Sequence, residues 1–344
     1  MLSTISSQFQ EETSSDVVGA SDVYLKRTEI GEKEVLISSR VGILFYRAHY
    51  LAGNTNVIDA LAQSLSVRGL IPVPIYVSSL KSVEVQQALI QHCQSVELLI
   101  NTTSFAITSL NANAEQSQRE AKSLWQVLDI PILQAICSGS PREQWQKHPQ
   151  GLTPRDIAMN VALPEVDGRI IARAVSFKVA QAESLEAGKG LQTPVVMYEP
   201  ERDRIEFVAE LAANWIRLRR TAVRDRKIAL ILANYPNRDG RMANGVGLDT
   251  PASCLEILKA LKQSGYTVND LPETGDALMA QLAAGATNDP EGYGLRPANQ
   301  TLSAQSYQAF FSTLPQSVQL GVNQRWGEAT DEWQRFHPAG YAEG

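Results

Sequence analysis

Polar side chains that could bind a ligand follow an apolar run near the start of the sequence. Residues 41–47 (VGILFYR) are β-branched and aromatic, as in a strand, and they lead into the loop AHYLAGNTN. A cation, an imidazole, an amide and a hydroxyl lie there, on Arg47, His49, Asn54 and Thr55. Such groups hold the carboxylates and amides of a ligand. Asn and Thr are also common helix caps, so a local structural role for Asn54 and Thr55 is the open alternative.

A second polar group follows another apolar run, residues 96–103 (VELLINTT), at Asn101 and Thr102. In an open parallel sheet, ligands bind beyond the carboxyl ends of the strands. We therefore expect Asn101 and Thr102 to join the side chains of the first loop in one polar rim.

The segment 234–251 (NYPNRDGRMANGVGLDTP) is a loop of about fifteen residues between an apolar run and a helix start. A strand-to-helix connection usually takes about 2–6 residues, so the extra length at the ligand edge of a sheet favours a functional role. Arg241, Asn244 and Asp249 supply donors and an acceptor there. Because neither GxxxxGK[ST] nor GxGxxG occurs in it, we expect that this chain does not itself bind ATP.

The histidines and cysteines do not have the spacing of a preformed metal site. The four histidines form no HxH or HxxxH pair, and the three cysteines are far apart without a CxxC pair. We therefore expect no resident metal. Glu165 and Asp167 are a candidate pair of carboxylates, although PEVDG is also typical of a turn.

An α/β scaffold must position the first loops. Apolar runs of strand length alternate with helical periodicity, which predicts a parallel sheet with helices on both faces. The predicted strands are 41–47, 71–77, 96–103, 130–136, 169–177 and 194–198. The predicted helices are 57–68 ended by Gly69, a segment near 115–128, a short helix opened by Thr153, Pro154 and Asp156, and 203–221.

The same order of elements begins again after the 203–221 helix. Residues 228–235 (IALILANY) predict a strand, and Thr250 caps a helix that extends to about Gln263 and stops at Gly265. This order repeats the one in residues 41–77. The sequence therefore predicts two Rossmann-like, parallel-sheet α/β domains with flanking helices, the second incomplete at the C-terminus.

The expected domain division follows from these patterns. Residues 1–34 are polar without apolar periodicity and predict a flexible leader. The first α/β domain is expected over residues 35–226. Residues 227–344 are expected to hold the start of the second domain and an irregular C-terminal tail.

Charge and hydropathy exclude two classes of partner. The net charge of −6 comes from 31 basic and 37 acidic residues, without the basic footprint of a nucleic-acid-binding protein. No apolar run approaches the roughly 20 residues needed to cross a bilayer, and the N-terminus lacks the pattern of a signal peptide. We expect a cytoplasmic protein with no nucleic-acid partner and no membrane span.

Five long motifs, in order along the chain, resemble one protein family. They are VGILFYRAHYLAGNTNVIDAL, PVPIYVSSLK, LLINTTSFA, RDIAMNVALPEVDGRI with RAVSFK, and LANYPNRDGRMANGVGLDTPAS. From about Val41 to about Asp289 the chain is similar to the large subunit of cobaltochelatase, the CobN family, which is related to the porphyrin-binding H subunit of magnesium chelatase. The glycine-rich segment GVGLDTPAS favours the cobalt branch.

The resemblance implies a large protein that binds the tetrapyrrole hydrogenobyrinic acid a,c-diamide and inserts Co²⁺ during aerobic cobalamin biosynthesis. It also implies partner AAA+ subunits that hydrolyse ATP, so that cobalt is a substrate metal and this chain binds no cofactor. His49 and Asp249 are the implied proton acceptors, and no residue is implied as a metal ligand. The implied substrate-binding residues are Arg47, Asn54, Thr55, Asn101, Thr102, Arg173, Lys178, Arg241 and Asn244.

Members of that family are several times longer than this chain. The chain is therefore expected to be a fragment, such as a truncated reading frame or a split subunit, and to be inactive as a chelatase by itself. Two alternatives remain open. One is a porphyrin-binding protein like the H subunit of magnesium chelatase, and the other is a non-catalytic α/β scaffold module.

Overall fold

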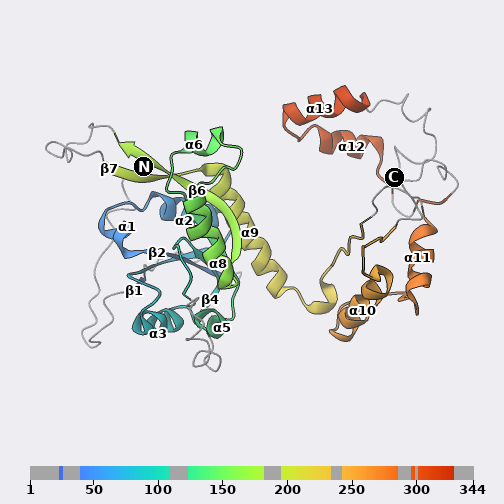
Figure 1. The fold of residues 1–344 in the computed structure, drawn as a ribbon, viewed down its shortest axis with the longest axis horizontal. Coiled ribbons are helices and arrows are strands. Elements are labelled where there is room, and N and C mark those ends of the chain that lie inside the picture. The colour runs from blue at the N-terminus through green and yellow to red at the C-terminus, as the bar shows by residue number, and fades with distance from the viewer. Residues whose placement is uncertain are drawn as a thin grey trace. The chain divides into compact units, whose positions relative to one another are not determined.

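The structure, a computed structural model, describes residues 23–25, 39–107, 123–181, 195–233, 242–285, 296–298 and 301–328 (Figure 1). The chain divides into two compact units, Met1–Arg220 and Thr221–Gly344. The division after Arg220 lies close to the boundary that the sequence predicts after residue 226.

Within the described residues, unit 1 contains a seven-stranded sheet (Figure 1). In spatial order its strands are β1 (Val23–Leu25), β3 (Ile71–Val77), β2 (Arg40–Tyr46), β4 (Val96–Asn101), β5 (Ile132–Cys137), β6 (Ile170–Gln181) and β7 (Val195–Pro200). Strands β2 to β6 are mutually parallel, whereas β1 and β7 pair antiparallel at the two edges. The predicted α/β class, a mostly parallel sheet flanked by helices, is confirmed.

Strand β1 lies inside the segment 1–34 that the sequence predicts as a flexible leader. Val23–Leu25 pairs with residues 75–77 of β3, so the prediction is wrong for these three residues. The other residues of the predicted leader lie outside the described residues. The open edge of a sheet offers unpaired N–H and C=O groups to any extended segment. A short segment can therefore pair there through its backbone although its sequence has no apolar periodicity.

Helices cover both faces of the sheet in unit 1. The helices are α1 (Arg47–Leu51), α2 (Asn56–Val67), α3 (Val83–His92), α5 (Leu124–Leu128), α6 (Arg142–Lys147), α7 (Pro154–Ile157), α8 (Leu163–Val166) and α9 (Arg202–Arg220), with a π-helical turn at Ala158–Ala162 between α7 and α8. On one face, α2 and α9 pack against Val41, Ile43 and Phe45 of β2. On the other face, α3 and α5 pack in a cluster that contains Leu44. Because both faces are covered, the whole strand is apolar, as in parallel sheets generally.

Local signals in the sequence correctly mark several helix ends. Gly69 has φ +75° just beyond α2, a conformation that glycine adopts without steric cost. Thr153 accepts a hydrogen bond from the backbone N–H of Asp156, with Pro154 in the first turn of α7. The helix predicted near 115–128 is described only from residue 123, where α5 lies.

The strand order reverses its direction at β2. The chain passes from β2 to β3 on one side of β2, and then to β4 on the other side. This reversal is the topological switch point at which open α/β sheets bind ligands, outside the carboxyl ends of the strands. Here those ends are followed by the segment 47–55, which begins with α1, and by the loop at residues 102–107.

Strands β6 and β7 form an antiparallel ribbon that connects back to this edge. β6 pairs with β5 only as far as Ser176, and its remaining residues up to Gln181 pair with β7. In β7, the backbone N–H of Tyr198 donates a 3.0 Å hydrogen bond to Oδ1 of Asn54, in the loop before α2. The ribbon therefore contacts the polar loop that follows β2.

Unit 2 differs from the second parallel-sheet domain that the sequence predicts. Residues 228–233 of the expected 228–235 strand form no ladder, and the remaining two lie outside the described residues. The side chains of Ile228 and Ile231 are 53% and 90% exposed. A run of strand-forming residues becomes a strand only beside a partner, and residues 267–269, which follow Gly265, form no strand either.

The helix expected in unit 2 is present. α10 (Thr250–Gln263) ends before Gly265 as predicted, although its N-cap is Asp249 rather than Thr250. The other helices described in this unit are α11 (Gly275–Ala283), α12 (Ala304–Phe311) and α13 (Gln316–Trp326).

The packing of α2 against the sheet yields a stability prediction. Leu61 is fully buried between α2, α9 and the sheet, so Leu61→Ala should lower the free energy of unfolding by about 3 kcal/mol through lost burial and a residual cavity. The matched change Leu51→Ala, at a side chain 69% exposed, should cost less than about 0.5 kcal/mol. Urea unfolding followed by circular dichroism measures both, and equal effects would contradict the assigned core.

Candidate functional site

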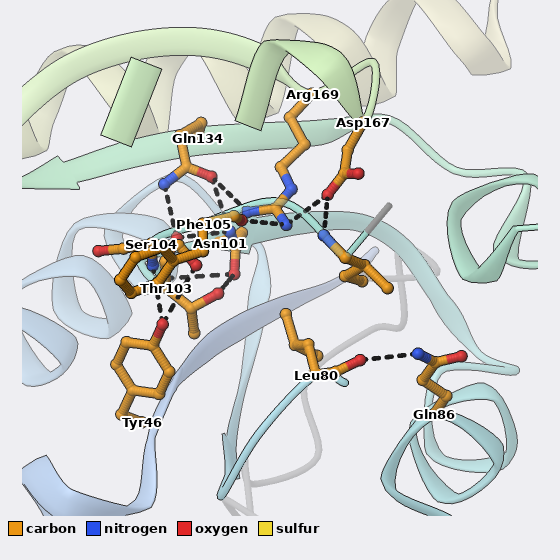
Figure 2. Close-up of polar contacts among 11 residues, drawn as sticks. Tyr46, Leu80, Gln86, Asn101, Thr103, Ser104, Phe105, Gln134, Asp167 and Arg169 are labelled. Carbon is orange, nitrogen blue, oxygen red and sulfur yellow. Dashed lines mark hydrogen bonds and ion pairs between the residues drawn. The ribbon is translucent and has the colours of Figure 1, made fainter. Parts of the chain in front are cut away.

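Tyr46 is the last residue of β2 and lies at the switch point. Gly42, Leu44 and Tyr46 alternate onto the face that α3 and α5 cover, and the Tyr46 ring therefore lies beside the chain that leaves β4. Its hydroxyl donates to the carbonyl oxygen of Ser104 at 3.1 Å and accepts from the N–H of the same residue at 3.1 Å (Figure 2). Burial raises the pKa of Tyr46, so the hydroxyl keeps its proton at neutral pH and can serve both bonds.

A buried amide pair lies next to this clamp. Asn101 and Gln134 stand opposite each other on β4 and β5, and Nδ2 of Asn101 donates to Oε1 of Gln134 at 2.7 Å. Both amides also donate to the carbonyl oxygen of Thr103, at 3.1 and 2.9 Å. The polar side chains therefore bind the backbone that turns away from β4 (Figure 2).

An ion pair with no exposed side-chain surface joins this network. Arg169 precedes β6, and its Nη2 is 2.7 Å from Oδ2 of Asp167. The guanidinium also donates to Oε1 of Gln134 at 3.2 Å and to the carbonyl oxygen of Phe105 at 2.9 Å, while Asp167 accepts from the N–H of Ile107 at 2.8 Å. Burial lowers the pKa of Arg169, and the adjacent Asp167 opposes that shift.

The π-helical turn between α7 and α8 supplies the remaining contacts of this network. Asn160 lies in that turn and accepts a 2.6 Å hydrogen bond from the hydroxyl of Ser104. One turn earlier, the buried carboxylate of Asp156 accepts from the Ser138 hydroxyl at 2.8 Å and from the Gly139 N–H at 2.9 Å. A π-helical turn in an otherwise regular helix often marks a functional site.

His49 is a titratable group that lies near Tyr46 at this edge. It lies on α1, with its ring centroid 5.3 Å from that of Tyr198 and 6.3 Å from that of Tyr46. Burial, and then the positive charge of Lys178, lower the pKa of His49. The imidazole is therefore neutral at pH 7 and able to accept a proton. Lys178 in turn lies with Nζ 5.7 Å from the centroid of the Tyr198 ring.

Four of the predicted site residues hold the edge together. Asn101 donates from Nδ2 to Gln134, and Asn54, which is buried, accepts at Oδ1 from the N–H of Tyr198. Thr102 donates from its hydroxyl and its N–H to the carbonyl oxygen of Leu44, at 2.9 and 2.8 Å. The Thr55 hydroxyl donates to Oδ2 of Asp59 at 3.0 Å, so Thr55 occupies the N-cap position of α2 without a capping bond from its side chain.

Arg47, His49 and Lys178 are brought to this edge, whereas Arg173 is not. Arg47 begins α1 directly after β2, and Lys178 lies on the part of β6 that pairs with β7. Arg173 is exposed on β6, with its guanidinium carbon 3.5 Å from the centroid of the Phe207 ring on α9. Its position is a surface cation–π contact rather than part of the polar rim.

The remaining predicted residues belong to unit 2. Asn244 is exposed, and Oδ1 of Asp249 accepts a 3.0 Å hydrogen bond from the N–H of Ala252 as the N-cap of α10. Arg241 lies outside the described residues, together with residues 234–240.

Several residues of the site were not predicted from the sequence. Tyr46, Gln134, Arg169 and Tyr198 lie in predicted strands or directly before one. Gln134 carried a usable signal, because a polar side chain inside an apolar strand needs a buried partner. Asp167 is a predicted partner of Glu165, and its partner is instead Arg169.

Neither a metal cluster nor a membrane-spanning helix is found in the described part of the chain. Among those residues, no group of three or more His, Cys, Asp or Glu side chains could hold a metal ion. No helix formed by the same residues is long and apolar enough to cross a membrane.

The buried ion pair yields the second prediction. Arg169→Met leaves Asp167 as an unpaired buried charge and should cost about 3–5 kcal/mol, whereas the double change Arg169→Met with Asp167→Leu should recover much of that loss. Arg202→Met removes an exposed pair with Glu206 and should cost less than about 0.5 kcal/mol. Urea unfolding tests all three variants, and a small loss for the single Arg169 change would show that the pair is not the hub of this network.

The histidines yield a prediction about pH. Because the pKa of folded His49 is below its ordinary value of 6.5, the unfolded chain binds a proton more readily, and stability must fall as pH falls below about 6.5. His49→Gln removes that proton uptake and should flatten the fall. Burial lowers the pKa of His92 too, so His92→Gln should flatten it independently. Thermal melting from pH 7.5 to 5 measures the slopes, and an unchanged slope for both variants would contradict the assigned burial.

Comparison with known proteins places this edge in a family context. A family model described as CobN/Magnesium Chelatase matches residues 7–341. Two aerobic cobaltochelatase CobN subunits, from Sinorhizobium sp and Pseudomonas aeruginosa, are 44% and 45% identical to this chain. The matches extend over 290 and 293 residues, which is 83% and 84% of the chain. The solved catalytic subunit of cobaltochelatase from Mycobacterium tuberculosis matches 90% of the chain with a TM-score of 0.71 and 33% identity.

The matches cover only part of each relative. The chain spans 22% of the length of the two CobN subunits and 25% of the solved chain. Within that part the agreement extends over both units. Since the family model covers nearly the whole sequence, the chain belongs to the CobN/magnesium chelatase family.

Proposed function

We propose that this chain is part of the large, tetrapyrrole-binding subunit of an ATP-dependent cobaltochelatase, which inserts Co²⁺ into hydrogenobyrinic acid a,c-diamide in cobalamin biosynthesis. The observation that carries the proposal is the 44–45% identity to two aerobic cobaltochelatase subunits over more than four fifths of the chain. Because the chain spans about a fifth of their length, the proposed role is a share of the substrate site, and the chain alone is expected to be inactive.

The geometry of unit 1 supports a role at the switch point. As Co²⁺ enters the macrocycle, protons bound to ring nitrogens must leave, and a neutral base within reach speeds that transfer. His49 is such a base, because burial and Lys178 keep its imidazole unprotonated. In the proposal His49 accepts a proton. Asp249 was the other predicted acceptor, and its carboxylate already caps α10.

The rim of the macrocycle carries carboxylates and amides, which cations and amides recognise through charge-assisted hydrogen bonds. In unit 1 we assign that role to Arg47 and Lys178, which lie on α1 and on the β6–β7 ribbon beside His49. Asn54, Thr55, Asn101 and Thr102 act behind them as positioning residues, because their hydrogen bonds are made within the protein. In unit 2, Arg241 and Asn244 remain candidates for binding carboxylates or amides of the substrate.

The proposal assigns ATP hydrolysis to separate AAA+ subunits, and no cofactor to this chain. Support comes from the sequence, which contains no GxxxxGK[ST] phosphate loop. Cobalt enters only as the substrate metal.

A second candidate is a porphyrin-binding role like that of the H subunit of magnesium chelatase, because the matching family model carries both names. The two candidates differ in the ligand bound. A titration with hydrogenobyrinic acid a,c-diamide and with deuteroporphyrin IX, followed by macrocycle absorbance and tryptophan fluorescence, therefore distinguishes them.

We expect the chain to bind the corrinoid with a Kd in the micromolar range and the porphyrin more weakly. Lys178→Ala removes a cation from the rim and should weaken corrinoid binding several-fold, whereas Lys147→Ala, an exposed lysine on α6, should leave it unchanged. Tighter binding of the porphyrin would favour the magnesium branch. No response to either ligand at tens of micromolar would favour the non-catalytic scaffold.

A further inference from the structure

Phe105 has a backbone conformation that a bulky side chain rarely adopts. Its φ is +67°, in the left-handed region. Other described residues with positive φ are glycines, two aspartates and an alanine. Asp tolerates this region through local hydrogen bonds, whereas an aromatic residue there is a genuine outlier that costs about 1–3 kcal/mol.

The surrounding network holds Phe105 in that conformation from both sides. Its N–H donates to the carbonyl oxygen of Met159 in the π-helical turn at 2.9 Å, and its own carbonyl oxygen accepts from Nη2 of Arg169 at 2.9 Å. On either side along the chain, Ser104 is clamped by the Tyr46 hydroxyl and Ile107 by Asp167. Figure 2 shows Phe105 between the Tyr46 contact and the Arg169 contact. The strain is therefore imposed by buried groups rather than by a flexible loop.

Burial of the Phe105 side chain does not offset the free-energy cost of this backbone conformation. Phe105 is 45% exposed, whereas the aromatic residues Trp125 and Phe177 are 8% and 2% exposed. A strained backbone that holds a large apolar ring in solvent is costly twice over, and such costs are found at ligand-binding positions.

The position of Phe105 connects it to the proposed site. It follows β4 directly at the switch point, and one contact chain leads from Ser104 through Tyr46 to His49. Phe105 therefore lies at the same edge of the sheet as the proposed proton acceptor.

We infer that Phe105 is a substrate-contacting residue whose ring stacks on the face of the tetrapyrrole, with the Arg169–Asp167 pair and the Tyr46 clamp as its positioning groups. The inference rests on the proposed function and adds the contact to the macrocycle face, where Lys178 and Arg47 serve its rim. Offset stacking of flat π-systems supplies binding energy that an aliphatic side chain does not.

The test is the same corrinoid titration with variants at Phe105. Phe105→Gly removes the ring at a residue type that tolerates positive φ, so we expect about tenfold weaker binding of hydrogenobyrinic acid a,c-diamide with an unchanged or higher urea midpoint. Phe105→Trp keeps a stacking surface and should bind within about twofold of the parent. Phe310→Ala, at another exposed phenylalanine, should bind as the parent does.

The outcomes separate this inference from the function on which it rests. If Lys178→Ala weakens binding but Phe105→Gly binds as tightly as the parent, the stacking role is overturned and the proposed function stands. The inference would also be overturned if Phe105→Gly lost much stability and Phe105→Trp bound the corrinoid as weakly as Phe105→Gly does. Phe105 would then have a structural role. If the parent chain binds no tetrapyrrole, both fall together.

Discussion

The ion pair between Arg169 and Asp167 is the interaction on which the carboxyl edge of the sheet depends. Its two side chains have no exposed surface, and a lone charge in that position would be strongly unfavourable. The pair is stable because each partner also satisfies groups on other segments, namely the Gln134 amide and two backbone groups of the loop after β4. Arg169, the residue directly before β6, thereby holds the chain that leaves β4.

The polar network lies between two apolar clusters on the same face of the sheet. One cluster contains Trp125 of α5 together with side chains of α3. The other contains Phe177, beside the α7–α8 segment. The Arg169 guanidinium carbon lies 5.0 Å from the centroid of the Trp125 ring, so the cation also contacts the apolar side. Apolar packing fixes the two flanks, and directional hydrogen bonds fix the loop between them. This arrangement suits a site, because the loop at the edge is held by side chains that are themselves buried and hydrogen-bonded.

The sequence predicts the elements well where the signal is local. The strand 71–77 and the stop of α2 at Gly69 follow from residue type and spacing within a few positions. The polar side chains at Asn101 and Thr102 were also placed at the correct edge, but their hydrogen-bond partners lie 33 and 58 residues away. Periodicity carries no information about such pairs, so residues expected to face a ligand make their hydrogen bonds within the protein instead. The same limit explains why Arg169 and Phe105 were missed.

The apolar run at residues 228–233 shows the converse limit, since its residue types favour a strand that the described part of the chain does not pair. Ile231 is 90% exposed, and the described residues 228–233 are assigned to no strand. Unpaired apolar segments of this kind are templates for edge-to-edge association. The run 228–233 of unit 2 is therefore a segment that favours self-association of the polypeptide as its concentration rises.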